Sequence, residues 1–331
     1  MLYTFLKYFV GTGMKIFCRK IIINKPALTG IKGPVMLASN HPNSFLDAII
    51  LDVLFDQPIH SLARGDAFVH PIVNKILRSV KILPVYRTSE GVENLSHNYK
   101  TFASCVDIFR KNGLVLIFSE GLCENEWKLR PLKKGTARLA LQSWQENIPL
   151  RVLPIAINYS SFRRFGKNIY INFGDIIEKD DLPEGLSEGQ KVQQFNALLK
   201  KELESGVFVI DDTDRQRMAS LLEEKPGQIE NILLAIPAAL GWLLHWPLYT
   251  IIATAIAPKY KNTVHYDSIL IVLLLLSYPF YLTGCTLIAY AIFSTWHVLW
   301  LLLFFPFTAW AFTRLKPQLD HPGATAANVF H

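Results

Sequence analysis

The sequence predicts an α/β fold with a mostly parallel sheet and flanking helices, joined to an N-terminal interfacial helix and a C-terminal all-α membrane region. Three observations lead to this prediction. Apolar runs alternate with helical patterns between residues 34 and 173, residues 1–23 are amphipathic, and two stretches, 231–258 and 268–313, contain no Asp, Glu, Lys or Arg. Because alternating strands and helices favour a parallel sheet with right-handed crossovers, the polar side chains of a site are expected where strands end and helices begin.

Short apolar runs within residues 34–173 have the composition of strands. They are PVMLAS at 34–39, IHSLA at 59–63, KILPVY at 81–86, LVLIF at 114–118, RVLPIAI at 151–157 and NIYINF at 168–173. Segments with a helical apolar period lie at 44–55, 67–78, 92–112 and 135–147. We therefore place an α/β domain at residues 24–175. The polar residues 176–230 are expected to form a helical cap or linker, with helices over 187–204 and 212–224.

The N-terminal segment, residues 1–23, has the pattern of a helix lying in the membrane interface. At helical spacing, Lys7 and Lys15 fall on one side, opposite a row of apolar side chains. A cleaved signal peptide is the alternative, but Lys7 interrupts the apolar run and no small-residue cleavage site follows. We expect an interfacial helix.

The charge-free C-terminal stretches are too apolar for a soluble core, and we assign residues 231–314 to the membrane. Residues 268–313 are about twice the roughly 20 residues that cross a bilayer as a helix, which predicts two spans joined near Ser294. Residues 231–257 are long enough to span once, or they enter and leave by one face, because Pro237, Gly241 and Pro247 interrupt them. A polar tail follows at 315–331.

The distribution of basic residues predicts the topology of this integral membrane protein. If residues 231–257 are re-entrant and the next two segments cross as a pair, the flanking basic residues all stay cytoplasmic, which agrees with the positive-inside rule. These residues are Lys225, Lys259, Lys261, Arg314 and Lys316. A single crossing by 231–257 would instead place the last two on the opposite side. We expect the first arrangement, with the α/β domain on the cytoplasmic side.

Composition excludes several classes of protein. The four cysteines contain no CxxC pair and lie near no histidine cluster, so neither a disulfide framework nor a zinc site is expected. The net charge of +7 suits an anionic bilayer surface or phosphorylated substrates. No nucleic-acid-binding motif accompanies it, and we expect no nucleic-acid partner, no metal and no cofactor.

The stretch NHPNSFLD, at residues 40–47, carries a histidine and an aspartate between a strand and a helix. One interpretation is structural: Ser44-x-x-Asp47 fits a capping box, in which Asp47 reaches back to the Ser44 backbone. In the other, Pro42 keeps His41 outside the helix, so that the histidine folds back over the first turn. Asp47 then fixes the imidazole tautomer, and the second ring nitrogen acts as a base. Both roles are compatible, since a carboxylate has two oxygens.

Polar or unusual residues also end three later strands. Arg87 follows one strand, Glu120 and Gly121 follow the next, and Pro154 lies within another. Each has an ordinary explanation by itself: a surface charge, a turn, or the mark of an edge strand. Their order and spacing relative to His41 form a pattern.

That pattern resembles the membrane-associated glycerophospholipid acyltransferases, which include glycerol-3-phosphate and lysophosphatidic acid acyltransferases. The resemblance covers about residues 34–160. The first family block is Asn-His followed by Asp, here Asn40, His41 and Asp47, and it implies that His41 is the general base for the acceptor hydroxyl. The second block ends in an arginine that binds the acceptor phosphate, here Arg87.

Two further blocks extend the resemblance. The third is an aromatic or apolar residue followed by Pro, Glu, Gly, Thr and Arg, of which Phe118, Glu120 and Gly121 match and are implied to shape the acceptor site. The fourth is an apolar run with proline, here containing Pro154 and Ile155, and it is implied to shape the acyl pocket.

The sequence departs from the family pattern at two places. Five residues separate His41 from Asp47, where most members have four; some glycerol-3-phosphate and dihydroxyacetone-phosphate enzymes have the longer spacing. In the third block Ser119 replaces proline, and Cys123 stands where the family has its phosphate-binding arginine. Lys134 is the residue expected to replace that charge, with a solvated helix terminus as the alternative.

Each of the other basic residues near strand ends has two interpretations. Arg64, at the end of a strand, either faces the acceptor phosphate or pairs with Asp66. Arg163, Arg164 and Lys167 follow the proline block and either contact donor phosphates and lipid headgroups or are solvated surface charges.

The expected function is transfer of a fatty acyl group from a thioester, acyl-CoA or acyl-carrier protein, to a hydroxyl of glycerol-3-phosphate or 1-acylglycerol-3-phosphate at the bilayer surface. Acylation of a non-phosphate lyso-lipid and a non-enzymatic membrane lipid-binding protein are the alternatives. A lipid hydrolase with Ser44 as nucleophile is disfavoured, because the sequence has no G-x-S-x-G elbow and no second histidine in a comparable loop.

Overall fold

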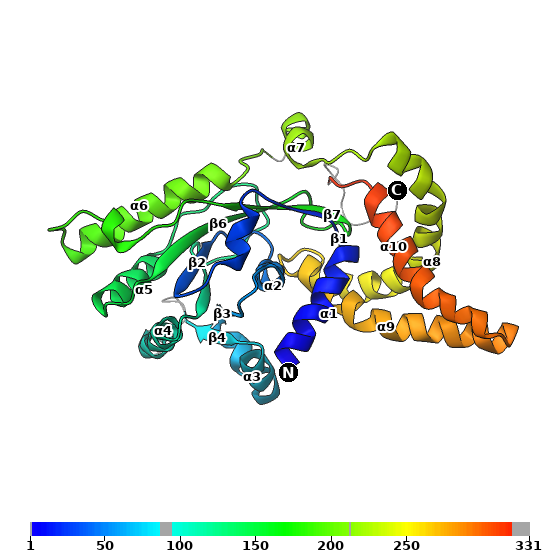
Figure 1. The fold of residues 1–331 in the computed structure, drawn as a ribbon, viewed down its shortest axis with the longest axis horizontal. Helices are drawn as coiled ribbons and strands as arrows, with labels where there is room; N and C mark the ends of the chain where they lie inside the picture. The colour runs from blue at the N-terminus through cyan, green and yellow to red at the C-terminus, as the bar shows by residue number, and fades with distance from the viewer. Residues whose placement is uncertain (1, 87–94, 212, 320–331) are drawn as a thin grey trace.

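The computed structural model describes residues 2–86, 95–211 and 213–319, in which a seven-stranded sheet organises the N-terminal two thirds (Figure 1). The strands are β1 (Cys18–Ile23), β2 (Val35–Ser39), β3 (Ile59–Arg64), β4 (Ile82–Val85), β5 (Leu114–Phe118), β6 (Arg151–Tyr159) and β7 (Lys167–Phe173). Their order is β1-β7-β6-β2-β5-β3-β4, and all neighbours pair in parallel except β6 and β7. The predicted, mostly parallel sheet is confirmed.

Helices cover both faces of this sheet (Figure 1). They are α1 (Leu2–Phe17), α2 (Phe45–Leu54), α3 (Pro71–Ser79), α4 (Leu95–Arg110), α5 (Lys134–Gln145), α6 (Glu188–Gly206) and α7 (Arg215–Leu222). Along β2, Val35 and Leu37 point into a core shared with α1 and α2, whereas Met36 and Ala38 point into a core shared with α4, α5 and α6. The period of two along a strand thus gives each face its own core.

The six expected strands are present, and a seventh, β1, was not expected. Residues 18–23 were predicted as the end of the interfacial helix, but the helix α1 ends at Phe17 and these residues pair with β7 at the sheet edge. The run Ile21-Ile22-Ile23 favours a strand because β-branched side chains are stiff and suit a pleated surface. The prediction of one helix over 1–23 is therefore wrong at its end.

The helix α6 belongs to the α/β domain and is not part of a linker. Phe195, Leu199 and Leu203 have no exposed surface and lie in the same core as Trp144 of α5. The domain therefore continues past residue 175, where the sequence analysis ended it. The polar composition of α6 reflects its outer face, since only one stripe of the helix is buried.

Three C-terminal helices are long and apolar enough to cross a membrane: α8 (Gln228–Tyr260), α9 (Tyr266–Phe293), and Trp296–Leu315, which contains α10 (Leu301–Leu315). The segments α9 and α10 meet at Ser294, whose backbone is left-handed with φ 50°. Proline does not end α8, which runs unbroken through Pro237 and Pro247 and curves in Figure 1. A side chain at Gly241 would overlap the Thr308 carbonyl, so glycine lets α8 and α10 pack closely.

The ends of these helices return to the α/β domain. Before α8, Glu224 pairs with Lys20 of β1 at 2.8 Å. Between α8 and α9, His265 contacts Ser44 at 2.6 Å. After α10, the Gln318 backbone carbonyl accepts from Ser160 at 3.2 Å. Both ends of α8 and the far end of α10 therefore contact one domain, while the α9–α10 junction at Ser294 lies away from it (Figure 1).

Candidate active site

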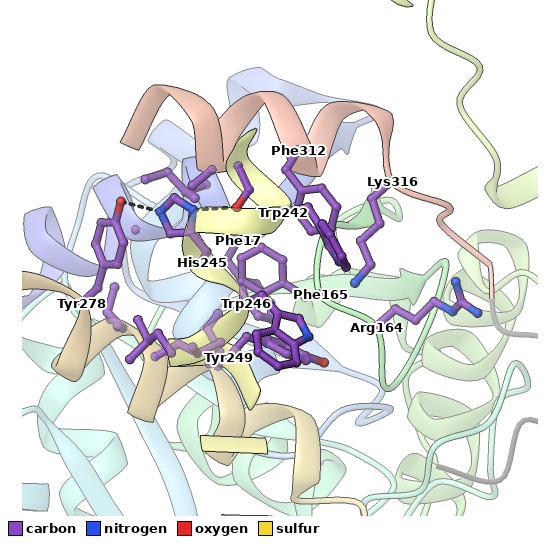
Figure 2. A pocket seen from close by; sticks show the side chains of 18 of the residues that line it. Phe17, Arg164, Phe165, Trp242, His245, Trp246, Tyr249, Tyr278, Phe312 and Lys316 are labelled. Atoms are coloured by element: carbon purple, nitrogen blue, oxygen red, sulfur yellow. Dashed lines mark hydrogen bonds between the residues drawn. The ribbon is translucent and has the colours of Figure 1, made fainter. Parts of the chain in front are cut away.

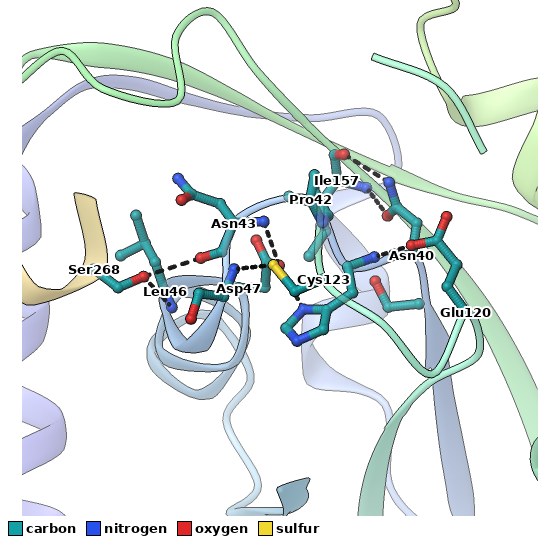
Figure 3. Close-up of polar contacts among 12 residues, drawn as sticks. Asn40, Pro42, Asn43, Leu46, Asp47, Glu120, Cys123, Ile157 and Ser268 are labelled. Atoms are coloured by element: carbon teal, nitrogen blue, oxygen red, sulfur yellow. Dashed lines mark hydrogen bonds and ion pairs between the residues drawn. The ribbon is translucent and has the colours of Figure 1, made fainter. Parts of the chain in front are cut away.

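The loop between β2 and α2 is held to the neighbouring strand β6 by one buried amide. Asn40 donates from Nδ2 to the Ile157 carbonyl at 3.0 Å and accepts from the Ile157 N–H at 2.8 Å (Figure 3). This pair of bonds ends β2 and turns the chain away from the sheet. As predicted, His41 lies in the turn before α2, which begins at Phe45.

The predicted pair of His41 and Asp47 is in contact. Nδ1 of His41 lies 2.8 Å from Oδ2 of Asp47, whose side chain is fully buried, and the His41 ring stacks on Phe118 at 3.8 Å between centroids. An ionised aspartate at Nδ1 fixes the neutral tautomer with its proton on that nitrogen. Nε2 has no hydrogen-bond partner among the described residues, and 18% of the side chain is exposed. The arrangement leaves Nε2 available to take a proton from a substrate.

Two further groups hold the Asp47 carboxylate. The Asn43 backbone N–H donates to Oδ2 at 2.9 Å, and the Tyr159 hydroxyl donates to Oδ1 at 2.6 Å. Burial, and then the charge of Asp47, raise the pKa of Tyr159 well above its usual range, so the phenol stays protonated and able to donate. A buried carboxylate needs such donors, because an unpaired charge in the core is costly.

The capping-box interpretation of Ser44 is wrong. The Ser44 side chain makes no capping hydrogen bond to α2, and Asp47 reaches back to the Asn43 N–H instead of to that of Ser44. The Ser44 N–H donates to Cys123 Sγ at 2.9 Å, and Ser44 Oγ lies against His265. The carboxylate thus accepts from the residue before the N-cap.

Glu120 supports the dyad from the turn after β5. Its Oε2 accepts from the His41 backbone N–H and its Oε1 from the Arg130 N–H, both at 2.7 Å. Burial raises the pKa of Glu120, while these two N–H groups and His41 oppose that shift. Gly121 follows with φ +64°, a conformation that favours glycine. The expected acceptor-shaping residues therefore lie beside His41, and Glu120 fixes its backbone.

Cys123, which stands at the position of the family's arginine, has a structural role here. It accepts the Ser44 N–H, and burial raises the pKa of its thiol, with the Asp47 charge adding to the effect. The thiol is thus protonated at neutral pH and carries no charge for a phosphate.

The basic residues predicted to bind phosphate are spread around the site. Arg64 ends β3, is half exposed and pairs with Asp66, as the structural alternative expected. Lys134 begins α5 and is exposed, whereas the neighbouring Lys133 packs its aliphatic chain against Gly121. Arg87 lies outside the described residues. Lys167 has no exposed surface and pairs with Asp267, so a role in binding headgroups or donor phosphates is excluded for it.

Pro154 and Ile155 lie within β6, paired with Ala38 and Ser39 of β2. Both are buried, and neither lines the apolar cavity found elsewhere in the described residues. That cavity, of about 270 Å³, lies among α1, α8, α9 and α10 (Figure 2). Its wall includes Phe17, whose ring lies 5.9 Å from Lys167 Nζ.

Several residues of the site were not singled out from the sequence: Asn43, Tyr159, His265 and Asp267. Asn43 lies inside the NHPNSFLD stretch, but the hydrogen bond from its backbone N–H to Asp47 depends on how the loop before α2 turns. The other three come from distant segments, and periodicity carries no signal for a contact between residues 47 and 159 or 43 and 267. Within the described residues, no group of three or more His, Cys, Asp or Glu side chains is placed to hold a metal ion.

Part of the chain is similar to known proteins. Residues 20–158 match the family model described as Acyltransferase. Among solved structures, the crystal structure of the 1-acyl-sn-glycerophosphate (LPA) acyltransferase PlsC from Thermotoga maritima matches with 14% identity and a TM-score of 0.44, over 61% of this chain and 77% of that one. No curated protein matches the chain. The matched residues 20–158 contain the His41–Asp47 dyad, and this part of the chain is similar to the acyltransferase family.

Proposed function

We propose that this protein transfers a fatty acyl group from an acyl thioester to a hydroxyl of glycerol-3-phosphate or 1-acylglycerol-3-phosphate in phospholipid biosynthesis. The observation that carries the proposal is the His41–Asp47 pair at 2.8 Å, with Nε2 of His41 directed away from Asp47. A tautomer fixed in this way suits general-base catalysis.

The proposed reaction is a direct transfer. Nε2 of His41 takes the proton of the acceptor hydroxyl, whose oxygen attacks the thioester carbonyl. The tetrahedral intermediate collapses as the carbon–sulfur bond breaks, and the proton passes to the leaving thiolate. The Asp47 carboxylate stabilises the imidazolium formed in the first step, since its Oδ2 faces Nδ1. Acyl-CoA and acyl-carrier protein are both suitable donors.

An anionic acceptor would lie on the basic side of the dyad. Burial lowers the pKa of His265, and the charges of Arg64 and His41 lower it further. These three groups therefore lie close together. Arg64 and Lys134 are exposed and bear positive charge, so they suit a phosphate at the mouth of the site. Arg87 remains a predicted member of this group.

The apolar cavity among α1 and the C-terminal helices is suited to the acyl chain. Leu275, Ile271 and Phe17 are among its lining residues, and its volume holds about nine water-sized groups at ~30 Å³ each. Phe17 and Lys167 stand between this cavity and Tyr159, which contacts Asp47. A chain entering here would lie within reach of lipid and behind the dyad.

The contacts of the helix ends support the topology in which the α/β domain is cytoplasmic and α8 is re-entrant. A straight helix of the length of α8 would reach about 50 Å at 1.5 Å per residue, more than the ~30 Å hydrocarbon core. Yet its two ends contact the same domain through Glu224 and His265. A reporter fused after residue 331 should be active in the cytoplasm, and activity confined to the opposite side would contradict this topology.

The proposed reaction is tested by giving the purified protein radiolabelled acyl-CoA, or acyl-carrier protein, with a panel of acceptors. We expect product with glycerol-3-phosphate or 1-acylglycerol-3-phosphate. Product only with a lyso-lipid that lacks phosphate would support the proposed acyl transfer but contradict the proposed acceptor. Lipid binding without product from any acceptor would favour a non-enzymatic lipid-binding protein.

A second candidate, a serine-dependent hydrolase or transferase, gains one observation from the structure. Ser44 Oγ lies 2.6 Å from His265 Nδ1, so a histidine from the turn between α8 and α9 reaches Ser44. Ser44 also has φ 53° at the start of a helix, as strained nucleophiles do. However, Ser44 is only 4% exposed. Accumulation of an acyl-enzyme that Ser44→Ala abolishes would favour this candidate.

A further inference from the structure

The turn between the membrane helices α8 and α9 forms part of the wall of the candidate active site. Asn43, in the catalytic loop, donates from Nδ2 to Asp267 Oδ2 at 2.7 Å. Ser268 Oγ donates to the Asn43 carbonyl at 3.0 Å and accepts from the Leu46 N–H at 3.2 Å (Figure 3). Two consecutive residues of α9, Asp267 and Ser268, thus hold the side chain and carbonyl of Asn43 and the first turn of α2.

The central group of this contact is a buried ion pair. Asp267 is 1% exposed and Lys167 is fully buried, and the Lys167 ammonium also lies 5.8 Å from the ring centre of Tyr159. Burying a single charge is strongly unfavourable, so each member of the pair requires the other. The pair brings together β7, the neighbour of the edge strand β1, and the first turn of α9.

Asn43 connects this ion pair to the dyad. The side chain of Asn43 is held by Asp267, and its backbone N–H donates to Asp47 Oδ2. That oxygen is also the one that faces His41 Nδ1. The position of Asp267 therefore determines where the Asn43 N–H points, and through it where the Asp47 carboxylate lies.

We propose that Asp267 is a positioning residue, by which the membrane region holds the His41–Asp47 dyad in its working geometry. The proposal rests on the proposed acyl transfer and adds that the α/β domain is complete as a catalyst only with α9 in place. Acyl transfer would then be coupled to correct packing of the membrane helices, because the turn that joins α8 to α9 also holds the catalytic loop.

The main test is a pair substitution, Asp267→Leu with Lys167→Leu, in the full-length protein. Removing both charges avoids leaving one unpaired in the core, and such replacements are often neutral for stability. We expect the thermal unfolding temperature and membrane insertion to stay close to those of the unchanged protein. We expect kcat for transfer to fall about 100-fold with KM for the thioester unchanged, since a displacement of the order of 1 Å costs that much.

A double-mutant cycle separates positioning from general structural damage. In an Asp47→Asn background the dyad is already impaired, so we expect the pair substitution to cost less than 3-fold further. An equal loss in both backgrounds would overturn the proposal. The conservative variant Asp267→Asn, combined with Lys167→Met, keeps an acceptor for Asn43 and should restore most of the rate.

Gln318→Ala is the matched control. Gln318 is buried and joins the segment after α10 to Glu224, which lies before α8. None of its hydrogen bonds to described residues reaches the dyad. We expect its kcat to stay within a few-fold of the unchanged protein. A pair-substituted protein with full activity would overturn the positioning role and leave the proposed function standing, whereas inactivity of the unchanged protein on every acceptor would defeat the proposed function itself.

Discussion

The Tyr159 hydroxyl lies 2.6 Å from Asp47 Oδ1, while the other oxygen of that carboxylate faces His41. Strand β6, which neighbours β2 in the sheet, thereby fixes the rotation of the Asp47 side chain, which comes from α2. The dyad is thus held by α2, by the loop before α2 and by β6. Its geometry therefore depends on how the sheet is assembled.

Tyr159→Phe should weaken both stability and transfer. The ring keeps its packing, but Asp47 Oδ1 loses its donor, and a hydrogen bond to a buried charge contributes about 1.5–3 kcal/mol. We expect a lower unfolding temperature and a reduced kcat with little change in KM. Tyr170→Phe is the control, because Tyr170 is also buried but makes no hydrogen bond through its hydroxyl to a described residue. Equal effects of the two substitutions would contradict the role given to Tyr159.

Glu120 should take up a proton at a higher pH than a surface glutamate. Burial favours its neutral form, so its pKa lies above the ordinary value of about 4.3. Infrared difference spectra between the unchanged protein and Glu120→Gln should show the protonated carboxyl band appearing early as the pH falls. The charges that face this carboxyl are those of His41 and Asp47. A band that appears only at the ordinary glutamate pKa of about 4.3 would contradict the shift.

The same Glu120→Gln substitution should reduce transfer at neutral pH. Both carboxylate oxygens accept N–H groups, and an amide offers one acceptor oxygen only, so either the His41 or the Arg130 N–H loses its partner. We expect kcat to fall at least 10-fold. Full activity would mean that Glu120 does not hold the His41 backbone.

Cys123 should be unreactive at neutral pH. Burial and the nearby Asp47 charge raise its thiol pKa, and only the thiolate is a good nucleophile. Treatment with N-ethylmaleimide, followed by peptide mass spectrometry, should leave Cys123 unmodified and transfer intact. Rapid modification of Cys123 with parallel loss of activity would show that the thiol is ionised or exposed.

Filling the apolar cavity should change the preference for acyl-chain length. Leu275 lines the cavity, and Leu275→Trp would occupy part of its 270 Å³. We expect the ratio of kcat/KM for long over short acyl thioesters to fall about 10-fold or more, since each excluded methylene costs ~0.8 kcal/mol of burial. Leu276→Trp is the control, because Leu276 is 51% exposed and does not line the cavity. An unchanged ratio for Leu275→Trp would place the chain elsewhere.

The parts of the fold that the sequence predicts are those set by local pattern. Strand β5 is a buried apolar run between helical segments, and the Pro42 signal keeps His41 out of α2. The edge strand β1 is not predicted because it begins at Cys18, directly after the last residue of the amphipathic helix, with no glycine or proline to mark the boundary. Its partner β7 lies far along the chain, so only the assembled sheet reveals it.

The missed parts of the site have the same origin. His41 and Asp47 are close in sequence, so the spacing and the family pattern identify them. In the sequence, Asp267 is only a charge at the border of an apolar stretch, because its role depends on a contact with Asn43. Likewise, the sequence predicts that Lys167 either contacts phosphates and headgroups or is a solvated surface charge, because positive charge is usually exposed. The buried carboxylate that neutralises it comes from a helix that the sequence places in the membrane.

The most direct test of the central claim compares single-turnover acyl transfer in the unchanged protein, His41→Ala and Ser44→Ala. If His41 is the base in a direct transfer, His41→Ala should lose at least 100-fold in rate while it remains folded and inserted, as expected for a lost general base. Ser44→Ala should retain most of the rate, and no acyl-enzyme should be trapped in any of the three. Full activity of His41→Ala, or an acyl group recovered on Ser44, would contradict the account.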